Sequence, residues 1–254
     1  MVYSLAKQIG RVPEHTVQLS DSDEQRAMEL HNNSIIFDLH MHAIILPDNL
    51  EDVELWSHDR RAQENVGFEG VKQGGITGFI DGLGGLNHRW DYESLVDSIG
   101  FRLGNIDRNY EKAIRGLRAE DIYRAKRDDK FAIFLGVENS EQLGFDIDRV
   151  DVLYGLGIRC MGLSYNVRNP VADGRTERTD GGLSDFGIEV VARMNKLGIV
   201  IDAVHSGVQT TLDAAENSNA PIIVSHTGAR GVYDTRRMAT DQELRAIAST
   251  GGLA

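Results

Sequence analysis

Six short apolar runs, rich in β-branched residues, recur along the chain and are separated by longer stretches of mixed polarity. They span residues 35–40, 76–80, 131–135, 159–163, 199–204 and 221–225. Near-continuous apolar runs of this length are typical of strands that are covered on both faces, as in a parallel sheet. We therefore predict six buried strands that alternate with helices.

Helical periodicity is visible between these runs. The apolar side chains of residues 185–197 fall on one helical face, with Ser184 as the predicted N-cap and Gly198 as the predicted stop. The sequence Thr240-Asp241-Gln242-Glu243 has the spacing of a capping box and predicts a helix over the residues that follow. A short polar helix is predicted over residues 22–33.

The alternation of strands and helices, without a break in composition, indicates a single α/β unit. Six strands, with residues 251–254 as the approach to a seventh, predict a (β/α)8 TIM-like barrel that stops before its last strands. We assign residues 1–33 to an N-terminal extension and helix, and residues 34–254 to the barrel. A doubly wound sheet is the competing architecture, but its usual glycine-rich turn is replaced here by His40-Met41-His42.

Composition narrows the range of partners. The 254 residues include 27 Lys and Arg against 39 Asp and Glu, which gives a formal net charge of −12. This balance argues against a nucleic-acid-binding surface and against docking on anionic lipid. The single cysteine, Cys160, excludes an internal disulfide, and no run approaches the ~18 apolar residues of a membrane span. We expect a cytoplasmic protein with a small-molecule substrate, and we leave a homo-oligomer open.

Candidate metal ligands follow several of the predicted strands. His40 and His42 end the first run, Glu138 follows the third, and His205 and His226 follow the fifth and sixth. Strand ends of a barrel converge on one mouth, so these residues would meet there. Imidazole and carboxylate are ligands that zinc prefers. Taken singly, each would more simply be a hydrogen-bonded loop residue, so the prediction depends on all five together.

The spacing of His40 and His42 places both imidazoles on one face of a strand. Four histidines and one carboxylate exceed what one open zinc site needs, and they suit two metals ~3.5–4 Å apart with Glu138 as the bridge. The pair Arg236-Arg237 is either a solvated helix flank or a site for bidentate capture of a carboxylate.

The ordered motifs of the chain resemble those of the membrane (renal) dipeptidase family, the M19 metallopeptidases, within the amidohydrolase-like barrels. The motifs lie at residues 38–42, 136–138, 163–166 with Asn169, 172–174, 181–187, 202–205 and 225–227. The resemblance implies a (β/α)8 barrel with a dinuclear zinc site that cleaves dipeptides. It covers residues 131–254 most closely, and the preceding part mainly at the first strand.

The resemblance also implies roles for individual residues. His40 would bind one zinc, Glu138 would bridge both, and His205 and His226 would bind the other. Arg237, eleven residues after His226, matches the arginine that holds the substrate carboxylate. A further position, Tyr165, falls where better-known members have a substrate-contacting histidine.

Two departures from the family pattern stand out. The usual first-strand motif is His-x-Asp, whereas this chain has His40 and His42, which removes a negative charge from the site. The family also has a late-strand Asp that handles the substrate amino group, and nothing before Ala254 corresponds to it. The catalytic proton-transfer residue is therefore unassigned, and we expect either a truncated piece of a longer enzyme or a barrel completed by another chain, because missing strands expose open edges.

The leading prediction is a zinc-dependent dipeptidase with two zinc ions per chain, which hydrolyses dipeptides or similar small amides through a metal-bound hydroxide. Another metal-dependent reaction on the same barrel is the first alternative, such as non-peptide amide or lactone hydrolysis or decarboxylation. It is motivated by His42 and Tyr165, since a fold does not fix its chemistry. A non-catalytic metal-binding homologue is the second alternative, motivated by the missing late-strand Asp.

Overall fold

The computed structural model describes residues 18–42, 67–83 and 90–254, so the predicted extension before residue 18 lies outside the described residues. The chain divides after Ser34 into two compact units, Met1–Ser34 and Ile35–Ala254. The first unit contains helix α1 (Asp21–Asn33), which confirms the predicted polar helix. The Ser20 side chain caps it by accepting from the main-chain N–H of Asp23, and none of its residues is buried.

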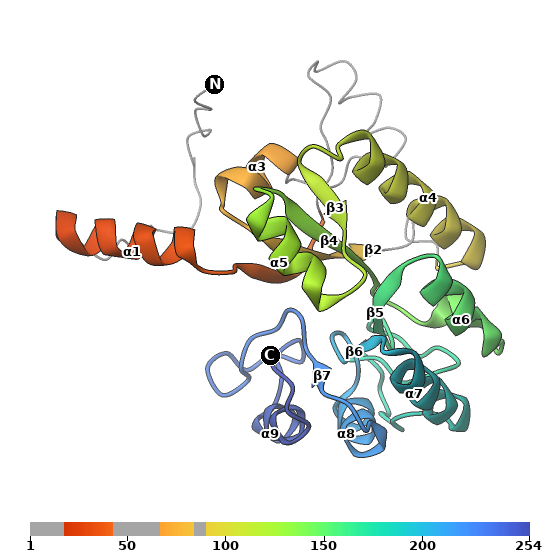
Figure 1. The fold of residues 1–254 in the computed structure, drawn as a ribbon. Coiled ribbons are helices and arrows are strands. Elements are labelled where there is room, and N and C mark those ends of the chain that lie inside the picture. The colour runs from red at the N-terminus through yellow and green to blue at the C-terminus, as the bar shows by residue number, and fades with distance from the viewer. Residues whose placement is uncertain (1–17, 43–66, 84–89) are drawn as a thin grey trace, which may run out of the picture. The chain divides into compact units, whose positions relative to one another are not determined.

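The second unit is built on one parallel sheet (Figure 1). Its strands are β1 (Phe37–Met41), β2 (Gly78–Leu83), β3 (Ala113–Arg115), β4 (Phe131–Val137), β5 (Ile158–Gly162), β6 (Val200–Asp202) and β7 (Ile222–Ile223). They are hydrogen-bonded in the order β1-β2-β4-β5-β6-β7, and every pairing between them is parallel. The six predicted strands and the α/β class are therefore confirmed.

Strand β3 is the element that the sequence did not predict. It pairs with residues 131–133 of β4, while β5 pairs with residues 135–137 of the same strand. Because β2 pairs with residues 132–137 of β4, β3 and β5 share the other edge of β4. Its three residues carry too little apolar sequence to be recognised as a run.

The sheet is curled into a half-barrel. His40 in β1 and His226 just after β7 stand at opposite ends of the strand order, yet their ring centroids are only 3.9 Å apart. Two ends of a sheet meet in this way only when the sheet bends round on itself. Leu253 makes a parallel bridge to Ile223, as expected from the predicted approach of a further strand at residues 251–254.

Helices follow the strands along the chain and pack against the sheet (Figure 1). They are α3 (Phe68–Gln73), α4 (Tyr92–Arg108), α5 (Ala119–Arg127), α6 (Asp148–Gly155), α7 (Asp185–Leu197), α8 (Val208–Asn217) and α9 (Asp241–Ser249), with a 3-10 turn η2 (Glu141–Leu143). The predicted caps are confirmed. Ser184 accepts from the N–H of Gly187 at the start of α7, and Gly198 ends it with φ 77°. Thr240 and Glu243 form both bonds of the capping box of α9.

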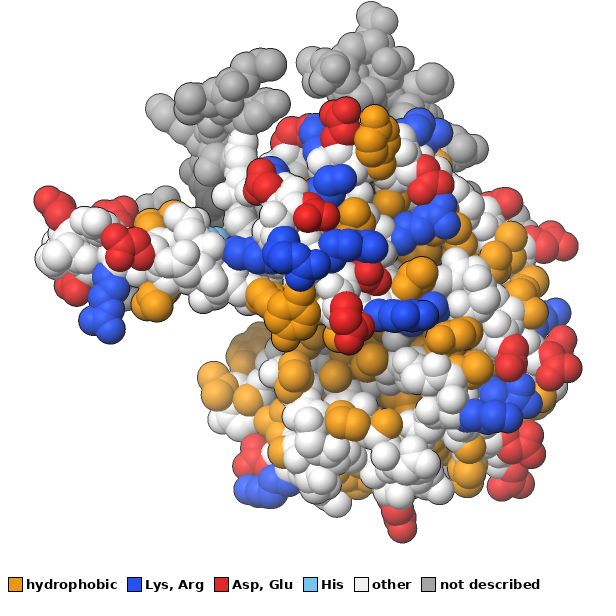
Figure 2. All heavy atoms as spheres, in the orientation of Figure 1, with side chains coloured by type: hydrophobic (Ala, Val, Ile, Leu, Met, Phe, Trp, Pro, Cys, Tyr) orange, Lys and Arg blue, Asp and Glu red, His pale blue; other side chains and the backbone are white. Residues whose placement is uncertain are grey.

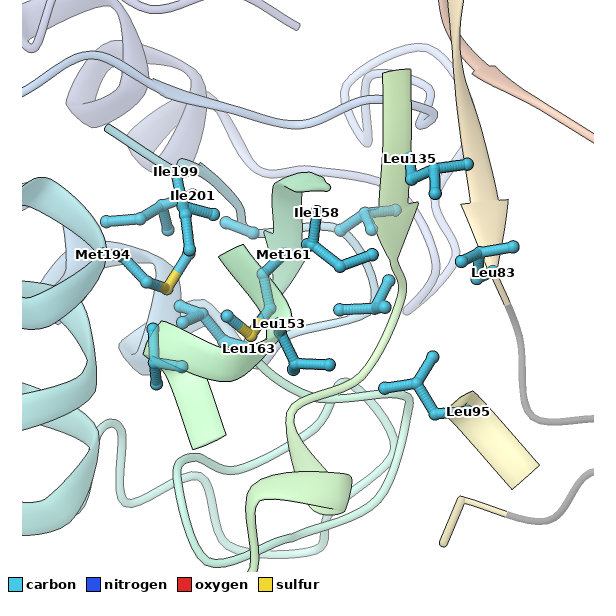
Figure 3. Close-up of a cluster of buried hydrophobic side chains, with 14 of the residues drawn as sticks. Leu83, Leu95, Leu135, Leu153, Ile158, Met161, Leu163, Met194, Ile199 and Ile201 are labelled. Carbon is cyan, nitrogen blue, oxygen red and sulfur yellow. The ribbon is translucent and has the colours of Figure 1, made fainter. Parts of the chain in front are cut away.

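Alternate side chains of each strand are buried on opposite faces of the sheet. Those on the outer face pack under the helices, and Figure 3 shows Leu135, Ile158, Met161 and Met194 in this cluster. Those on the inner face, Ile80, Phe134, Cys160 and Ile223 among them, form a second cluster inside the curl. Each fully buried side chain of this size stabilises the fold by about 1.5–3 kcal/mol. The same alternation aims the last residues of the strands into the barrel mouth.

The face shown in Figure 2 carries charged side chains of both signs among apolar and uncharged ones. Figure 2 shows Lys and Arg side chains in a band across the middle of the view, with Asp and Glu side chains on either side. Exposed ion pairs such as Arg193 with Asp151 belong to this mixed surface. None of the helices in the described ranges is long and apolar enough to span a membrane.

Candidate metal centre

The predicted ligands from the two ends of the sheet meet around one carboxylate. On the β1 side, Nε2 of His40 and Nε2 of His42 are 3.0 Å apart. The Oε1 atom of Glu138 lies 3.5 Å from Nε2 of His42 and 3.9 Å from Nε2 of His40. Two imidazole nitrogens thus converge on one oxygen of Glu138.

His205 approaches the other oxygen of the same carboxylate, and His226 lies next to His205. Nε2 of His205 is 3.9 Å from Oε2 of Glu138 and 3.1 Å from Nε2 of His226. The donor atoms of His40, Glu138 and His226 all lie within 4.8 Å of one another, which is close enough for a metal ion. The structure therefore brings together all five residues that the sequence nominated, and His226 lies beside both His205 and His40.

Two local features of the strands make this approach possible. A β-bulge in β1, between Asp38 and Met41, breaks the strict alternation, so that Leu39 packs in the inner cluster while the next residue, His40, also turns into the barrel. Bulges re-aim side chains in this way beside functional sites. On β2, Gly82 leaves the space that the His40 ring occupies, since a Cβ there would be 2.9 Å from Nδ1 of His40 and closer still to Cε1.

Burial sets the charge state of the site. Desolvation holds the pKa of His40, His205 and His226 at about 3, with neighbouring histidines and Arg237 adding to the effect. Desolvation, together with the charge of Asp202, raises the pKa of Glu138 to about 7. Neutral imidazole is the form that binds metals, so the three rings are ready to act as ligands at neutral pH. A bound cation would favour the ionised form of Glu138.

Hydrogen bonds behind the rings orient them. Nδ1 of His205 donates to Oδ1 of Asn166 at 3.0 Å, because a carbonyl oxygen can only accept. The lone pair of Nε2 is then left pointing at the centre, which is the arrangement seen at metal-binding histidines. The hydroxyl of Ser225 lies 3.0 Å from Nδ1 of His226 and supports that ring with a second hydrogen bond. The sequence did not assign either of these supporting roles.

Two aspartates close to the histidines in the sequence, Asp38 and Asp202, accept hydrogen bonds from main-chain N–H groups. Asp202, expected to be structural, accepts from the N–H groups of Val204 and Ser225 and so ties the ends of β6 and β7 together. Asp38 accepts from the N–H of His40 at 2.8 Å. Both carboxylates therefore fix main-chain segments that carry proposed ligands, Asp38 within β1 and Asp202 after β6 and β7.

The two predicted substrate residues border the histidines. Nη2 of Arg237 donates to the main-chain oxygen of His226 at 2.9 Å and lies 3.4 Å from Nε2 of His205. Its neighbour Arg236 is exposed, so Arg237 is the one of the two arginines that lies against the histidines. The ring of Tyr165 stacks on His205 with centroids 4.2 Å apart.

An aromatic residue missed by sequence reasoning extends this side of the site. The Trp90 ring lies 4.8 Å from that of Tyr165, so the two rings and His205 form a row. Burial, with the charge of Glu138, raises the pKa of Tyr165, and its hydroxyl stays protonated at neutral pH. A lone tryptophan in a polar stretch gives no sequence signal of such a role.

The sequence profile of one protein family, membrane dipeptidase (peptidase family M19), matches residues 24–254. The chain belongs to this family. An uncharacterized dipeptidase of Schizosaccharomyces pombe is 35% identical to it over 140 residues, which are 53% of this chain and 34% of the yeast protein. The M19 motifs of the sequence thus led to the correct family.

Solved structures share the M19 fold. An amidohydrolase from Pseudomonas aeruginosa is 31% identical, with a TM-score of 0.74 over 89% of this chain and 63% of its own. A metallopeptidase from Rhodobacter sphaeroides, solved with a phosphinate mimic of the dipeptide L-Ala-D-Ala, is 18% identical, with a TM-score of 0.72 over 87% of this chain and 73% of its own. The chain therefore spans about a third of the yeast relative and less than two thirds of the Pseudomonas protein.

Proposed function

We propose that this chain carries the dinuclear zinc centre of a dipeptidase. In this proposal His40 and His42 bind one ion, His205 and His226 bind the other, and Glu138 bridges the two. The observation that carries the proposal is the position of the Glu138 carboxylate. Its Oε1 atom lies 3.5 and 3.9 Å from Nε2 of His42 and His40, and its Oε2 atom lies 3.9 Å from Nε2 of His205, which is next to His226.

The chemistry of the donors fits zinc. The proposed ligands are four imidazoles and one carboxylate. Nitrogen-rich sets of this kind suit zinc, whereas magnesium and calcium prefer all-oxygen ligands. When bound, a pair of such ions supplies a water of lowered pKa as nucleophile and a Lewis acid for the scissile carbonyl. The hydrogen bond that Asn166 accepts holds the His205 ring with Nε2 toward the centre, and a hydrogen bond with Ser225 supports the His226 ring.

Arg237 is the proposed binding residue for the substrate carboxylate. Its guanidinium is half-buried beside His205 and is held through Nη2 by the main-chain oxygen of His226. A guanidinium can bind a carboxylate with two parallel hydrogen bonds, so Arg237 would fix the C-terminal carboxylate of a dipeptide and orient its peptide bond toward Glu138. The neighbouring rings of Tyr165 and Trp90 would then border the substrate and exclude water.

The test is metal stoichiometry, measured by elemental mass spectrometry on purified protein dialysed into chelator-free buffer. We expect about two zinc ions per chain in the unaltered protein and the loss of one in His205→Ala. The matched control is His31→Ala, which removes an imidazole from α1, in the other compact unit. Zinc-free protein, or two ions retained in His205→Ala, would refute the centre.

One observation favours a second reaction on the same centre. The β1 side presents two imidazoles, His40 and His42, so that Glu138 is the one carboxylate among the five proposed ligands. The lower negative charge makes hydrolysis of a non-peptide amide or a lactone the alternative function. Ordinary turnover on a panel of dipeptides would exclude it.

A cytoplasmic location and a homo-oligomeric state stay predictions from the sequence.

A further inference from the structure

Two residues beside the centre have an unusual backbone conformation. His205 has φ 61° and Asn166 has φ 65°, and they are two of the three non-glycine residues with positive φ in the described part of the chain. This left-handed conformation is strained for residues with a side chain and persists only where the surroundings enforce it. The two residues are also joined by the hydrogen bond between their side chains.

Residues 174–176 enforce the conformation of both. The N–H of Arg175 donates to the main-chain oxygen of His205 at 2.8 Å, and the N–H of Asn166 donates to the same oxygen at 3.3 Å. The N–H and the hydroxyl of Thr176 both donate to the main-chain oxygen of Asn166, at 2.8 and 2.7 Å. Gly174 allows this close approach, because a Cβ there would overlap the main chain of Asn166.

The side chain of Arg175 anchors this segment to helix α9. Its Nη1 and Nη2 atoms donate to the two carboxylate oxygens of Glu243 at 3.1 and 2.6 Å. The two side chains are only 4% and 1% exposed. Glu243 is held in turn by the N–H and hydroxyl of Thr240 at the start of the helix. Such a buried bidentate pair fixes its partners firmly, and the loss of one partner leaves a buried charge uncompensated.

We propose that Arg175 and Glu243 are positioning residues for His205. The pair fixes residues 174–176, these residues hold His205 and Asn166 in the left-handed conformation, and the Nε2 atom of His205 is thereby aimed at Glu138. Neither Arg175 nor Glu243 touches the substrate or the reacting atoms in this account. The role in metal binding rests on the proposed function, whereas the effect on the His205 ring does not.

The first test is a stepwise zinc titration against a competing chelator. We expect Glu243→Gln to weaken one of the two binding steps about 10- to 100-fold, the range for residues that support a metal ligand, and to leave the other step unchanged. A general loss of stability would instead weaken both zinc-binding steps. The matched control is Asp241→Asn, which also removes a carboxylate from the first turn of α9 but from an exposed pair with Arg245. We expect the control to bind both ions as the unaltered protein does.

The second test reads the ring of His205 in metal-free protein. In ¹⁵N NMR spectra, with the signal assigned by its loss in His205→Gln, we expect an Nδ1-protonated ring in the unaltered protein and in Asp241→Asn. Glu243→Gln should instead give averaged tautomers. If Glu243→Gln does not fold, Arg175→Met with Glu243→Leu removes the pair without leaving a buried charge, and the same results are expected.

The outcomes separate the two ideas. An unaltered protein that binds no zinc refutes the proposed function, and the NMR result alone then decides the positioning role. A folded pair variant with an unchanged His205 ring refutes the positioning role. So does a zinc affinity that is unchanged, or weakened equally at both steps.

Discussion

Gly82 faces the imidazole of His40 so closely that the ring occupies the place of a β-carbon: a Cβ on Gly82 would lie 2.9 Å from Nδ1 of His40 and 3.3 Å from Oε1 of Glu138. The absence of a side chain on β2 is therefore a condition for the position of a proposed ligand on β1. This relationship yields the first prediction.

Gly82→Ala should displace His40 and lower the zinc bound on the β1 side. The added methyl group has no free space, so the overpacking should also cost about 1–3 kcal/mol of the free energy of unfolding. Gly100→Ala is the control, because Gly100 lies in α4 with nothing near its Cβ position and should raise stability by about 0.5–1 kcal/mol. Zinc content and chemical denaturation measure both effects. An alanine that leaves zinc binding intact would show that the ring is free to move.

Arg237→Lys should raise KM for dipeptides about 10- to 100-fold with a smaller change in kcat. A lysine keeps the charge but cannot make two parallel hydrogen bonds to a carboxylate, and hydrogen bonds to charged groups contribute about 1.5–3 kcal/mol. Arg236→Lys makes the same exchange at the exposed neighbour and should leave KM unchanged. Steady-state kinetics on a dipeptide decide the point. Equal effects of the two exchanges would contradict a specific role for Arg237.

His42→Asp should shift the metal preference of the β1 side. The exchange gives the centre a second carboxylate, and carboxylates suit manganese whereas imidazoles suit zinc. We expect the affinity for Mn²⁺ relative to Zn²⁺ to rise about 10-fold, within the range of affinity changes seen around metal sites. Competition titrations with both ions provide the measurement, with His31→Asp on α1 as the control. An unchanged ratio would mean that His42 is not a ligand.

The buried pair of Arg175 and Glu243 should make stability depend on pH in acid. Burial alone would raise the pKa of Glu243, but hydrogen bonds from Arg175 and Thr240 outweigh it, and the net pKa is lowered. The stabilisation is therefore complete above the unfolded pKa of about 4.3 and is lost as the pH falls through the lower folded pKa. The difference in free energy of unfolding between the unaltered protein and Glu243→Gln should shrink between pH 6 and acid on the order of pH 3. A difference that stays constant would refute the pair's contribution.

The fold was predictable wherever an element carried its own signal. Strand β4 has seven buried residues in succession. Helices α7 and α9 each begin directly after a residue whose side chain caps the helix. Strand β3 has one buried residue in three and is stabilised by its pairing with β4, which no local pattern encodes. The bulge in β1 could not be predicted either, since the sequence of residues 37–41 is typical of an ordinary strand.

The candidate centre was predictable as a set of residue types but not as a set of contacts. Imidazoles and a carboxylate at strand ends stand out because few other residue types bind metals. The supporting roles of Asn166 and Arg175 could not be predicted, because their side-chain partners lie 39 and 68 residues away in the chain. The signal that would have pointed to Asn166 is its left-handed backbone, which asparagine adopts more readily than most residues and which only the structure reveals.

The meeting of His40 and His226 across the opening of the sheet has a thermodynamic consequence. Strands β1 and β7 are not paired with each other in the described sheet, so ions shared by ligands from both ends would act as a cross-link between the first and last strands. The free energy of binding then becomes free energy of folding, about 2.7 kcal/mol when free metal is at 100 times its Kd. Occupancy of the centre and closure of the half-barrel become one equilibrium, and a chelator that empties the site should lower Tm.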